Sequence, residues 1–488
     1  MRAWFAIPLA VVGGALAALA LPPFHYWWLA PVGYAALGAV LLDVGAKRRL
    51  RRAFVFFLAF FAIGLAWMDE FSLPGAVLLV LLETALCTVP VILLPRNRGP
   101  MLVALPAVVM LGEAFRYRFP LGGLPMAGAA LGQVDGPFLL WARVAGDFAL
   151  VFTAAFVGAA VCAIVVGLRV KAPGLRRTAT AVLVVLLLAT GAAALLVRAP
   201  RATHPIRVAY AQGGGVRGLR AVDNDVIDVY GNQLKATDKL TGPVDLLVWP
   251  EDVIDLPGPI AKDPVRLDMG ALATKLHATI VAGVVEDFRK DRFRNAAVAW
   301  DRSGKIVDRY DKVHRVPFGE YVPARGLVSK LGDISAVPRD AFPGTGPGLL
   351  LTRHVELGVV ISYEVFFSDR AREAVRAGGE LLLVPTNASS FKGRQVPAQE
   401  VGAAQLRAVE TGRDLVQAAP TGHSAFVDAH GNTSKVSTLG VRALATATLQ
   451  RRSGLTPFDR YGDRPMIGWM LFVLVAAAVL DRTVKSNK

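Results

Sequence analysis

At 488 residues, 54% of them hydrophobic and with a mean hydropathy of +0.45, the chain is too long and too apolar to be one soluble domain. The net charge of +16 does not indicate nucleic-acid binding, because much of the excess lies in short loops between apolar runs, where anionic lipid headgroups are the expected partner. The two cysteines lie inside apolar runs and exclude a disulfide framework, and no Cys/His spacing predicts a metal site.

Eight apolar runs, each near the ~17–25 residues that a helix needs to cross a bilayer, predict eight transmembrane helices. They lie at about 4–22, 26–45, 53–69, 74–95, 101–118, 141–168, 178–198 and 465–481. No small-residue cleavage site follows the first run, so we expect a helix there and not a cleaved signal peptide. Seven helices then form a membrane domain at 1–203, and the eighth occupies 463–488 with a short tail.

Basic residues predict the orientation of these helices, because loops rich in Lys and Arg stay in the cytoplasm. The segments "KRRLRR" (47–52) and "RNR" (96–98), the basic residues between 169 and 177 and the tail from Arg482 all fall on one side. Both termini are therefore expected in the cytoplasm. Residues 204–462 are expected outside it.

Two acidic residues, Glu83 and Glu113, lie within apolar runs. An ionisable group is costly in a membrane, which makes a functional role a fair hypothesis for each. The alternative is that each lies near a helix end or pairs inside the bundle with a neighbour such as Arg116.

Residues 204–462 alternate short β-rich runs with helical stretches, which predicts a layered α/β domain. The expected strands lie at 206–212, 244–250, 278–287, 295–301, 357–362, 380–386, 414–419 and 424–429. Hairpin turns are expected at 303–305 and 430–432, and a helix at 397–413 that ends on Gly412.

Polar residues follow several of these apolar runs. Glu251 comes after "LLVWP", and Lys312 lies in "DRYDKVHRVPFGEYVP" with Glu320 in the same loop. Ser362 ends the run "LGVVIS" at a sharp exit that is typical of a strand presenting a nucleophile. Because the carboxyl ends of buried strands open into one crevice, these side chains are candidates for a shared site.

Four segments resemble the apolipoprotein N-acyltransferase family: "WPED" (249–252), "YDKVHRVPFGEYVP" (310–323), "SYE" (362–364) and "LRAVETGRDLV" (406–416). The resemblance covers nearly the whole chain. It implies a bacterial cytoplasmic (inner) membrane protein with an extracytoplasmic nitrilase-like αββα sandwich. The implied activity moves a fatty acyl chain from a phospholipid to the α-amino group of a lipoprotein's N-terminal diacylglyceryl cysteine, through an acyl-enzyme.

Carried over by position, the resemblance gives each strand-end residue a role. Glu251 matches the general base, Lys312 the catalytic lysine and Glu320 a supporting glutamate. Ser362 stands where the family has its nucleophilic cysteine. The backbone N–H of Tyr363 is expected to hold the oxyanion together with Lys312. Glu364 either braces the site or forms an ordinary ion pair.

Substrate contacts are expected from two further segments. Phe318 and Tyr321 lie in the lysine-bearing loop, and Phe318 is assigned to an apolar entrance for acyl chains. Asn387 and Ser390 lie in "NASSFK" (387–392), where family members tend to carry Asn-Asp-Ala-Trp-Phe-Gly. Trp249 and Phe366 are expected to be packing residues.

The serine weakens the implied chemistry, because an alcohol is a far weaker acid than a thiol and an oxyester is less activated than a thioester. Three interpretations therefore stay open: an N-acyltransferase that works through serine, a catalytically impaired paralogue that binds lipid or lipoprotein, and a nitrilase-like amidase or esterase on another envelope substrate. The changes in "NASSFK" favour natural divergence over an engineered Cys-to-Ser exchange. No cofactor and no metal are implied, and a monomer is expected.

Overall fold

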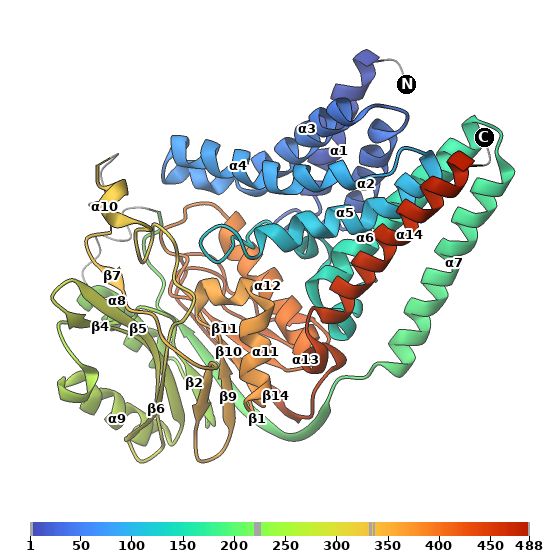
Figure 1. Ribbon diagram of the computed structural model, residues 1–488. Coiled ribbons are helices and arrows are strands. Elements are labelled where there is room, and N and C mark those ends of the chain that lie inside the picture. Colours follow the sequence, from blue (N-terminus) through green and yellow to red (C-terminus); the bar gives the residue numbers. More distant parts are fainter. Residues whose placement is uncertain (1–2, 219–225, 331–333, 335–336, 487–488) are drawn as a thin grey trace. The chain divides into compact units, whose positions relative to one another are not determined.

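The computed structural model describes residues 3–218, 226–330, 334 and 337–486, so the last two residues of the predicted tail lie outside the described part. The chain divides into two compact units (Figure 1). We call Met1–Arg198 with Arg460–Lys488 the helical unit, and Ala199–Asp459 the sandwich unit.

A helix forms at each of the eight apolar runs of the helical unit. These are α1 (Ala3–Ala18), α2 (Leu29–Leu41), α3 (Ala46–Gly64), α4 (Leu73–Thr88, continued by the 3₁₀ turn Val89–Leu93), α5 (Arg98–Arg116), α6 (Trp141–Arg169), α7 (Pro173–Leu196) and α14 (Arg464–Ser486). Among the described residues, five helices are long and apolar enough to cross a membrane: α4 with its 3₁₀ turn, α5, α6, α7 and α14. The helices α1 and α2 are apolar but shorter, and α3 starts with a basic run.

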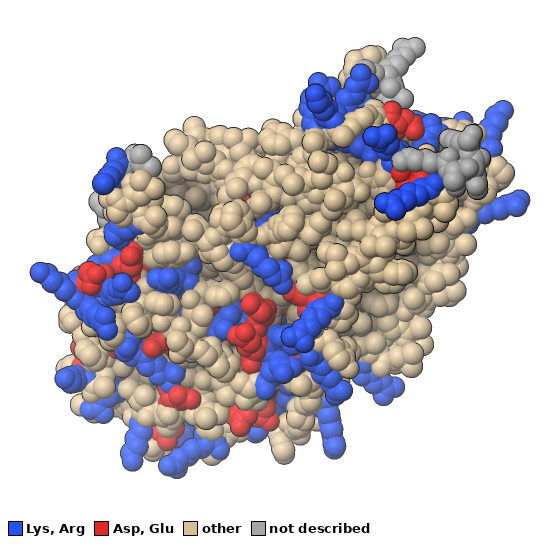
Figure 2. Space-filling model, in the orientation of Figure 1, with Lys and Arg blue, Asp and Glu red and all other residues tan. Residues whose placement is uncertain are grey.

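Several polar contacts join the loops of the helical unit at one end. Arg98 at the start of α5 pairs with Asp43 at 2.6 Å, and the backbone N–H of Asn97 donates to Asp481 of α14 at 2.9 Å. Arg49 of α3 donates to the carbonyls of Leu94 and Pro95. Figure 2 shows Lys and Arg side chains gathered at this end. The basic loops therefore share one side of this unit, as the charge pattern predicts.

The two intramembrane acidic residues pair with Arg116, as the second interpretation of the sequence expected. The guanidinium donates to Glu83 at 2.6 Å and to Glu113 at 3.3 Å, and all three side chains are buried. Arg116 also donates to the carbonyl of Met126, and Glu113 accepts the backbone N–H of Ala129. This cluster fixes the loop that follows α5.

Two β-sheets, as far as the chain is described, form the sandwich unit. The first has the order β14-β1-β2-β4-β5-β6, with β3 beside β4 and β7 beside β5. Its strands are β1 (Arg201–Gln212), β2 (Leu246–Val248), β3 (Ile254–Leu256), β4 (Thr279–Arg289), β5 (Arg292–Trp300), β6 (Ile306–Asp311), β7 (Asp340–Ala341) and β14 (Ala443–Ser453). The second has the order β13-β12-β11-β10-β9-β8, with β8 (Leu349–Leu351), β9 (Glu356–Val359), β10 (Leu381–Pro385), β11 (Leu415–Ala418), β12 (Ala425–Val427) and β13 (Thr433–Ser434).

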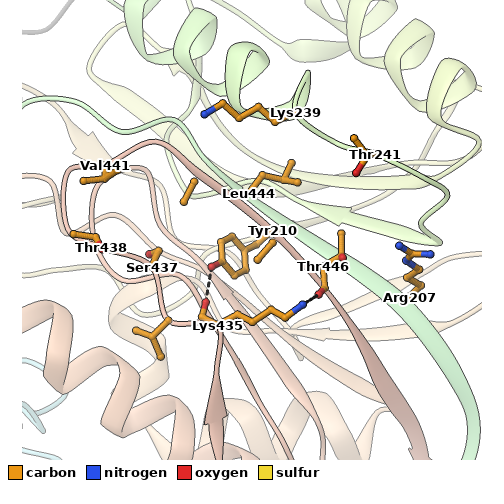
Figure 3. A pocket seen from close by; sticks show the side chains of 13 residues that line it. Arg207, Tyr210, Lys239, Thr241, Lys435, Ser437, Thr438, Val441, Leu444 and Thr446 are labelled. Carbon is orange, nitrogen blue, oxygen red and sulfur yellow. Dashed lines mark hydrogen bonds between the residues drawn. The ribbon is translucent and has the colours of Figure 1, made fainter.

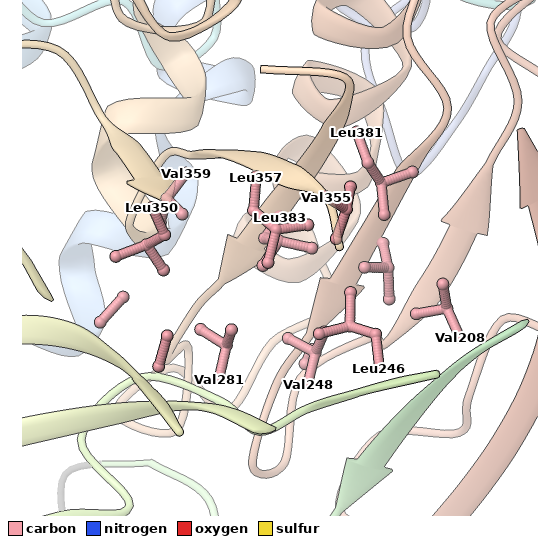
Figure 4. Close-up of a cluster of buried hydrophobic side chains, with 14 of the residues drawn as sticks. Val208, Leu246, Val248, Val281, Leu350, Val355, Leu357, Val359, Leu381 and Leu383 are labelled. Carbon is pink, nitrogen blue, oxygen red and sulfur yellow. The ribbon is translucent and has the colours of Figure 1, made fainter. Parts of the chain in front are cut away.

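The sheets pack face to face over an apolar core. Val208, Leu246 and Val248 of the first sheet meet Leu357 and Leu383 of the second, all of them buried (Figure 4). Burial of such side chains stabilises the fold by about 1.5–3 kcal/mol each relative to exposure. Helices α8 (Val226–Thr237) and α9 (Val265–Leu276) cover the first sheet, and α11 (Ser368–Arg376) and α12 (Gln395–Thr411) cover the second. The unit is therefore the αββα sandwich that was expected.

Strand direction places the candidate residues at one edge of the second sheet. β9, β10 and β11 are parallel, so their carboxyl ends meet at the same edge. Ser362 follows β9, and Thr386 follows β10 directly. All eight expected strands form, and Gly412 ends α12 in the left-handed conformation with φ +59°.

Candidate active site

Glu251 lies just after β2, and its side chain is buried. Its Oε1 accepts a hydrogen bond from Lys312 Nζ at 2.8 Å and another from Asn295 Nδ2 at 2.8 Å. Gly283 of β4 packs directly against the backbone of Glu251. A Cβ at this glycine would lie 2.5 Å from Glu251 Cα and from the carbonyl oxygen of Pro250. The glycine therefore permits the close approach that sets the position of Glu251.

Lys312 follows β6 and is buried between two carboxylates. Its ammonium donates to Glu251 at 2.8 Å and to Glu320 at 2.9 Å. Burial opposes the charged form of Lys312, but the two carboxylates outweigh burial and raise its pKa. Burial likewise raises the pKa of Glu251, against the influence of Lys312. The lysine thus stays a cation beside a carboxyl group that can take up and return a proton.

Glu320 completes this cluster from the loop after β6. Its Oε2 accepts the backbone N–H of Val316 at 2.7 Å, so the same carboxylate orders its own loop. Asn295 of β5 donates to both Glu320, at 3.0 Å, and Glu251. Sequence reasoning missed Asn295, because an asparagine before an apolar run is also typical of a strand boundary.

Ser362 lies at the sharp exit that the sequence predicts. Its backbone has φ +49°, and it starts the 3₁₀ turn η6 (Ser362–Phe366) shortly after the end of β9. A residue other than glycine in this conformation costs roughly 1–2 kcal/mol, which the surrounding fold must supply. Ser362 is buried, with 7% of its surface exposed.

Glu364 joins two segments of the candidate site. Its carboxylate accepts the backbone N–H of Ile361 at 2.9 Å, of Val313 at 2.8 Å and of His314 at 3.0 Å. It also accepts the hydroxyl of Tyr310, while the guanidinium of Arg370 lies 3.7 Å away. Since Val313 is adjacent to Lys312, this carboxylate connects the serine turn to the lysine loop. Tyr363, expected to hold the oxyanion through its N–H, is buried in the same turn.

The aromatic residues around the site differ in exposure. Phe318 is 55% exposed and has φ +60°, so an apolar ring stands at the surface of the loop that carries Lys312. Tyr321 is half-buried under Arg315, whose guanidinium carbon lies 4.2 Å from the ring centre. Trp249 and Phe366 are buried packing residues.

The segment 387–392 runs along the same edge. Asn387 Nδ2 lies 3.4 Å from the Asp252 carboxylate, and Asn387 Oδ1 accepts the backbone N–H of Ser389. Ser390 is half-buried. Arg217 holds the segment through its backbone, because the guanidinium donates to the carbonyls of Phe391, at 2.6 Å, and of Gly393.

Two buried carboxyl groups beside this cluster were missed by sequence reasoning. Asp252 directly follows Glu251, and burial together with the charge of Glu251 raises its pKa. Glu400 of α12 is buried, and burial raises its pKa to about 8. The sequence shows Asp252 beside Glu251, but it gives no sign that Glu400 is buried.

A cavity of about 650 Å³ lies elsewhere in the sandwich unit, beside β1 and β14 (Figure 3). Arg207, Tyr210 and Lys435 are among its lining residues, and none of the expected site residues lines it. Within the described part of the chain, no group of His, Cys, Asp and Glu side chains is placed to hold a metal ion. The acid–base cluster around Glu251 is therefore the candidate active site.

Comparison with known proteins assigns both parts of the chain. Residues 207–455 match the carbon-nitrogen hydrolase family, and residues 13–160 match the apolipoprotein N-acyltransferase N-terminal domain. The apolipoprotein N-acyltransferase of Pseudomonas aeruginosa (strain LESB58) is 30% identical over 518 residues, which cover 98% of this chain and 96% of that protein. The chain belongs to the apolipoprotein N-acyltransferase family.

A second relative agrees with this assignment. The apolipoprotein N-acyltransferase of Photobacterium profundum is 27% identical, with 97% of this chain and 95% of that protein covered. Among solved structures, Saccharomyces cerevisiae Nit3, a member of branch 10 of the nitrilase superfamily, is 20% identical with a TM-score of 0.39, and covers 51% of this chain and 91% of its own. We therefore interpret the cluster around Glu251 as a candidate site for acyl transfer.

Proposed function

We propose that this protein is an N-acyltransferase that moves a fatty acyl chain from a membrane phospholipid to the α-amino group of a lipoprotein's N-terminal diacylglyceryl cysteine. The observation that carries the proposal is the buried cluster of Glu251, Lys312 and Glu320, in which both carboxylates lie within 2.9 Å of the ammonium. It lies in a carbon-nitrogen hydrolase domain whose serine turn is tied to the lysine loop. A protein that only bound lipid would not need this cluster.

In the first half-reaction, Ser362 Oγ attacks the carbonyl carbon of the phospholipid ester and its proton passes to Glu251. The resulting oxyanion is stabilised by the Lys312 ammonium and by the backbone N–H of Tyr363. The described residues use two of the three N–H groups of Lys312, and the third serves the oxyanion. The C–O bond to the glycerol then breaks, and the lysophospholipid leaves with the proton from Glu251.

In the second half-reaction, the neutral amine of the acceptor attacks the carbonyl carbon of the acyl-serine. A C–N bond forms, the bond to Ser362 Oγ breaks, and a proton of the amine returns to Oγ through Glu251. Since Lys312 has a raised pKa, it acts throughout as a fixed positive charge and not as a base.

The helical unit is proposed to place this chemistry at a bilayer. All eight helices that form at the apolar runs, the shorter α1 and α2 included, are taken as spans of a bacterial cytoplasmic membrane, with both termini in the cytoplasm and the sandwich unit outside it. The basic loops that meet near Arg98 and Asp481 support this orientation. The exposed Phe318 would meet the acyl chains, and the protein is taken to act as a monomer.

The test is the intact mass of the full-length protein in detergent, before and after incubation with phospholipid. Ser362→Ala and Ser362→Cys are run beside it, and a diacylated lipopeptide is then added. We expect an acyl adduct that requires Ser362 and that disappears as the N-acylated peptide forms.

Two other results would reject the proposal as stated. An adduct that decays only to free fatty acid would identify a hydrolase of the same superfamily. Absence of an adduct on the native protein, together with one on Ser362→Cys, would mean that the fold and pocket persist in a protein that binds lipid without transferring it.

A further inference from the structure

Glu400 is a buried carboxyl group with one oxygen bonded and the other without a partner. It lies on α12 with 3% of its surface exposed, and Oε1 accepts the hydroxyl of Thr386 at 2.6 Å. Its Oε2 is buried and has no hydrogen-bond partner among the described residues. Because buried polar atoms in folded proteins are almost always paired, this oxygen points to a donor that arrives with a ligand.

A second buried carboxylate oxygen without a partner among the described residues belongs to Asp252. Thr386, which holds Glu400, is followed by Asn387, whose amide lies 3.4 Å from Asp252 Oδ2. The other oxygen of that carboxylate, Asp252 Oδ1, is also buried without a partner among the described residues. Thr386 and Asn387 are consecutive residues that follow β10, so both carboxyl groups are bonded to residues at the same end of this strand.

This position is next to the proposed catalytic cluster. Asp252 directly follows Glu251, and the charges of Glu251 and Lys312 both act on Glu400. Arg217 also acts on Glu400, and Thr386 donates its hydroxyl to it. Thr386 lies at the carboxyl end of β10, and Ser362 follows the parallel strand β9, so a ligand that bonds Glu400 Oε2 lies at the same edge of the sheet as Ser362.

The chemistry of the two oxygens selects a cation with several N–H groups. Both are acceptors, and two neighbouring carboxyl groups favour positive charge. A primary ammonium carries three N–H donors and one positive charge. The proposed reaction brings such a group to the site, namely the α-ammonium of the acceptor.

We propose that Glu400, together with Asp252, forms the subsite that binds the acceptor's α-ammonium and takes one proton from it before attack. This inference rests on the proposed function and names the residue that activates the acceptor. The Glu400 carboxylate becomes a carboxylic acid and the ammonium becomes a neutral amine. The amine then attacks the acyl-serine as described above, and the proton held by Glu400 leaves to solvent.

A serine enzyme has particular need of this step. A free α-amino group has a pKa of about 7.7–8.0, so near neutral pH it is mostly protonated and cannot attack. An oxyester is a poorer acyl donor to an amine than a thioester, which makes a high fraction of neutral amine more important. Without a ligand, Glu400 holds its proton up to about pH 8, and the charge of a bound ammonium favours the carboxylate, so the carboxyl proton leaves to solvent as the ammonium binds. The pKa values of the two groups are close, so proton transfer from the ammonium to the carboxylate then costs little.

The test separates the two half-reactions in the full-length protein in detergent. Release of lysophospholipid reports acyl-enzyme formation, and mass spectrometry reports transfer to the acceptor. Two acceptors are compared: a diacylated lipopeptide, whose α-amino group arrives protonated, and hydroxylamine, which is already neutral near pH 7. The ratio of the two transfer rates within one sample cancels any loss of folded protein.

We expect Glu400→Gln to lower transfer to the lipopeptide relative to hydroxylamine at least tenfold. Asp252→Asn is expected to change the ratio in the same direction by a smaller factor, and it serves as the second variant if Glu400→Gln does not fold. The control is Glu410→Gln on the same helix, whose carboxylate pairs with Arg407 at 2.8 Å. It is expected to leave the ratio unchanged.

An unchanged ratio in both Glu400→Gln and Asp252→Asn would overturn the inference and leave Glu400 as a structural partner of Thr386. If the native protein forms no acyl-enzyme, the comparison is made in Ser362→Cys, where a retained effect of Glu400→Gln supports the subsite although serine catalysis fails. If neither protein forms an acyl-enzyme, the proposed function fails and the inference fails with it.

Discussion

The carboxylate of Glu364 accepts the backbone N–H of Val313 at 2.8 Å. One end of this hydrogen bond lies two residues after Ser362, and the other lies one residue after Lys312. The turn that carries Ser362 follows a strand of the second sheet, and the loop that carries Lys312 follows a strand of the first, so the Glu364 side chain connects the two sheets at the candidate site. Because Glu364 accepts backbone N–H groups from both segments, a substitution of this one residue should change their relative position.

Glu364→Ala is expected to destabilise the sandwich unit and to slow acyl-enzyme formation strongly. The change removes the acceptor of three backbone N–H groups and of the Tyr310 hydroxyl. Loss of a hydrogen bond to a charged group costs about 1.5–3 kcal/mol, so a total of several kcal/mol is expected. The apparent melting temperature in detergent and the burst of lysophospholipid measure the two effects. Glu373→Gln, at a half-exposed side chain, is the control.

Lys312→Met is expected to abolish acyl-enzyme formation and to destabilise the protein by about 3–5 kcal/mol, because it leaves Glu251 and Glu320 buried without their cation. Adding Glu320→Gln removes one of the two unpaired charges. The double variant should regain part of the stability and none of the activity. Thermal unfolding and intact mass distinguish these outcomes, and an adduct on Lys312→Met would contradict the assigned role.

Gly283→Ala is expected to displace Glu251 and to reduce acylation at least tenfold. The new Cβ would lie 2.5 Å from Glu251 Cα and from the carbonyl oxygen of Pro250, and these backbone atoms cannot rotate away. Gly231→Ala on α8 is the matched control, since no atom lies within 4 Å of its Cβ position. In a helix that change should be neutral or stabilising by up to about 1 kcal/mol. Equal acylation rates in the two variants would refute the packing argument.

Glu400→Gln is expected to make the protein's stability less dependent on pH. The folded state holds the proton of Glu400 up to about pH 8, whereas the unfolded chain releases it near the ordinary value of 4.5. Between these values the unfolded state binds fewer protons, so the free energy of unfolding falls as the pH rises. Glutamine does not titrate, which removes a loss of at most about 5 kcal/mol. Apparent melting temperatures near pH 5 and pH 9 test this, and an equal difference at both would contradict it.

The sequence points to Glu251, Lys312 and Ser362 because each follows a strand. An apolar run followed at once by a charged or hydroxyl residue marks Glu251 and Ser362, and the left-handed cap at Gly412 marks the end of α12. These are local signals, each contained within a few residues. The pairing of Glu83 with Arg116 was left open, because one pattern of intramembrane charge suits both a functional site and a structural ion pair.

Other features depend on contacts between distant segments and leave little trace in the sequence. β14 is half-buried along most of its length, so the contrast in hydrophobicity between its two faces is weak. No strand was therefore expected at 443–453. Glu400 lies on α12, which is buried on nearly every side, so helical periodicity does not reveal which polar residue faces the site. The bracing role of Glu364 depends on Val313, which lies 51 residues away in the chain.

Arg217 holds the segment 387–393 through the carbonyl oxygens of Phe391 and Gly393. Carbonyl oxygens are the same whatever residue supplies them, so the path of this segment is insulated from the identity of its side chains. Substitutions of side chains in this segment should therefore leave the path of its backbone in place.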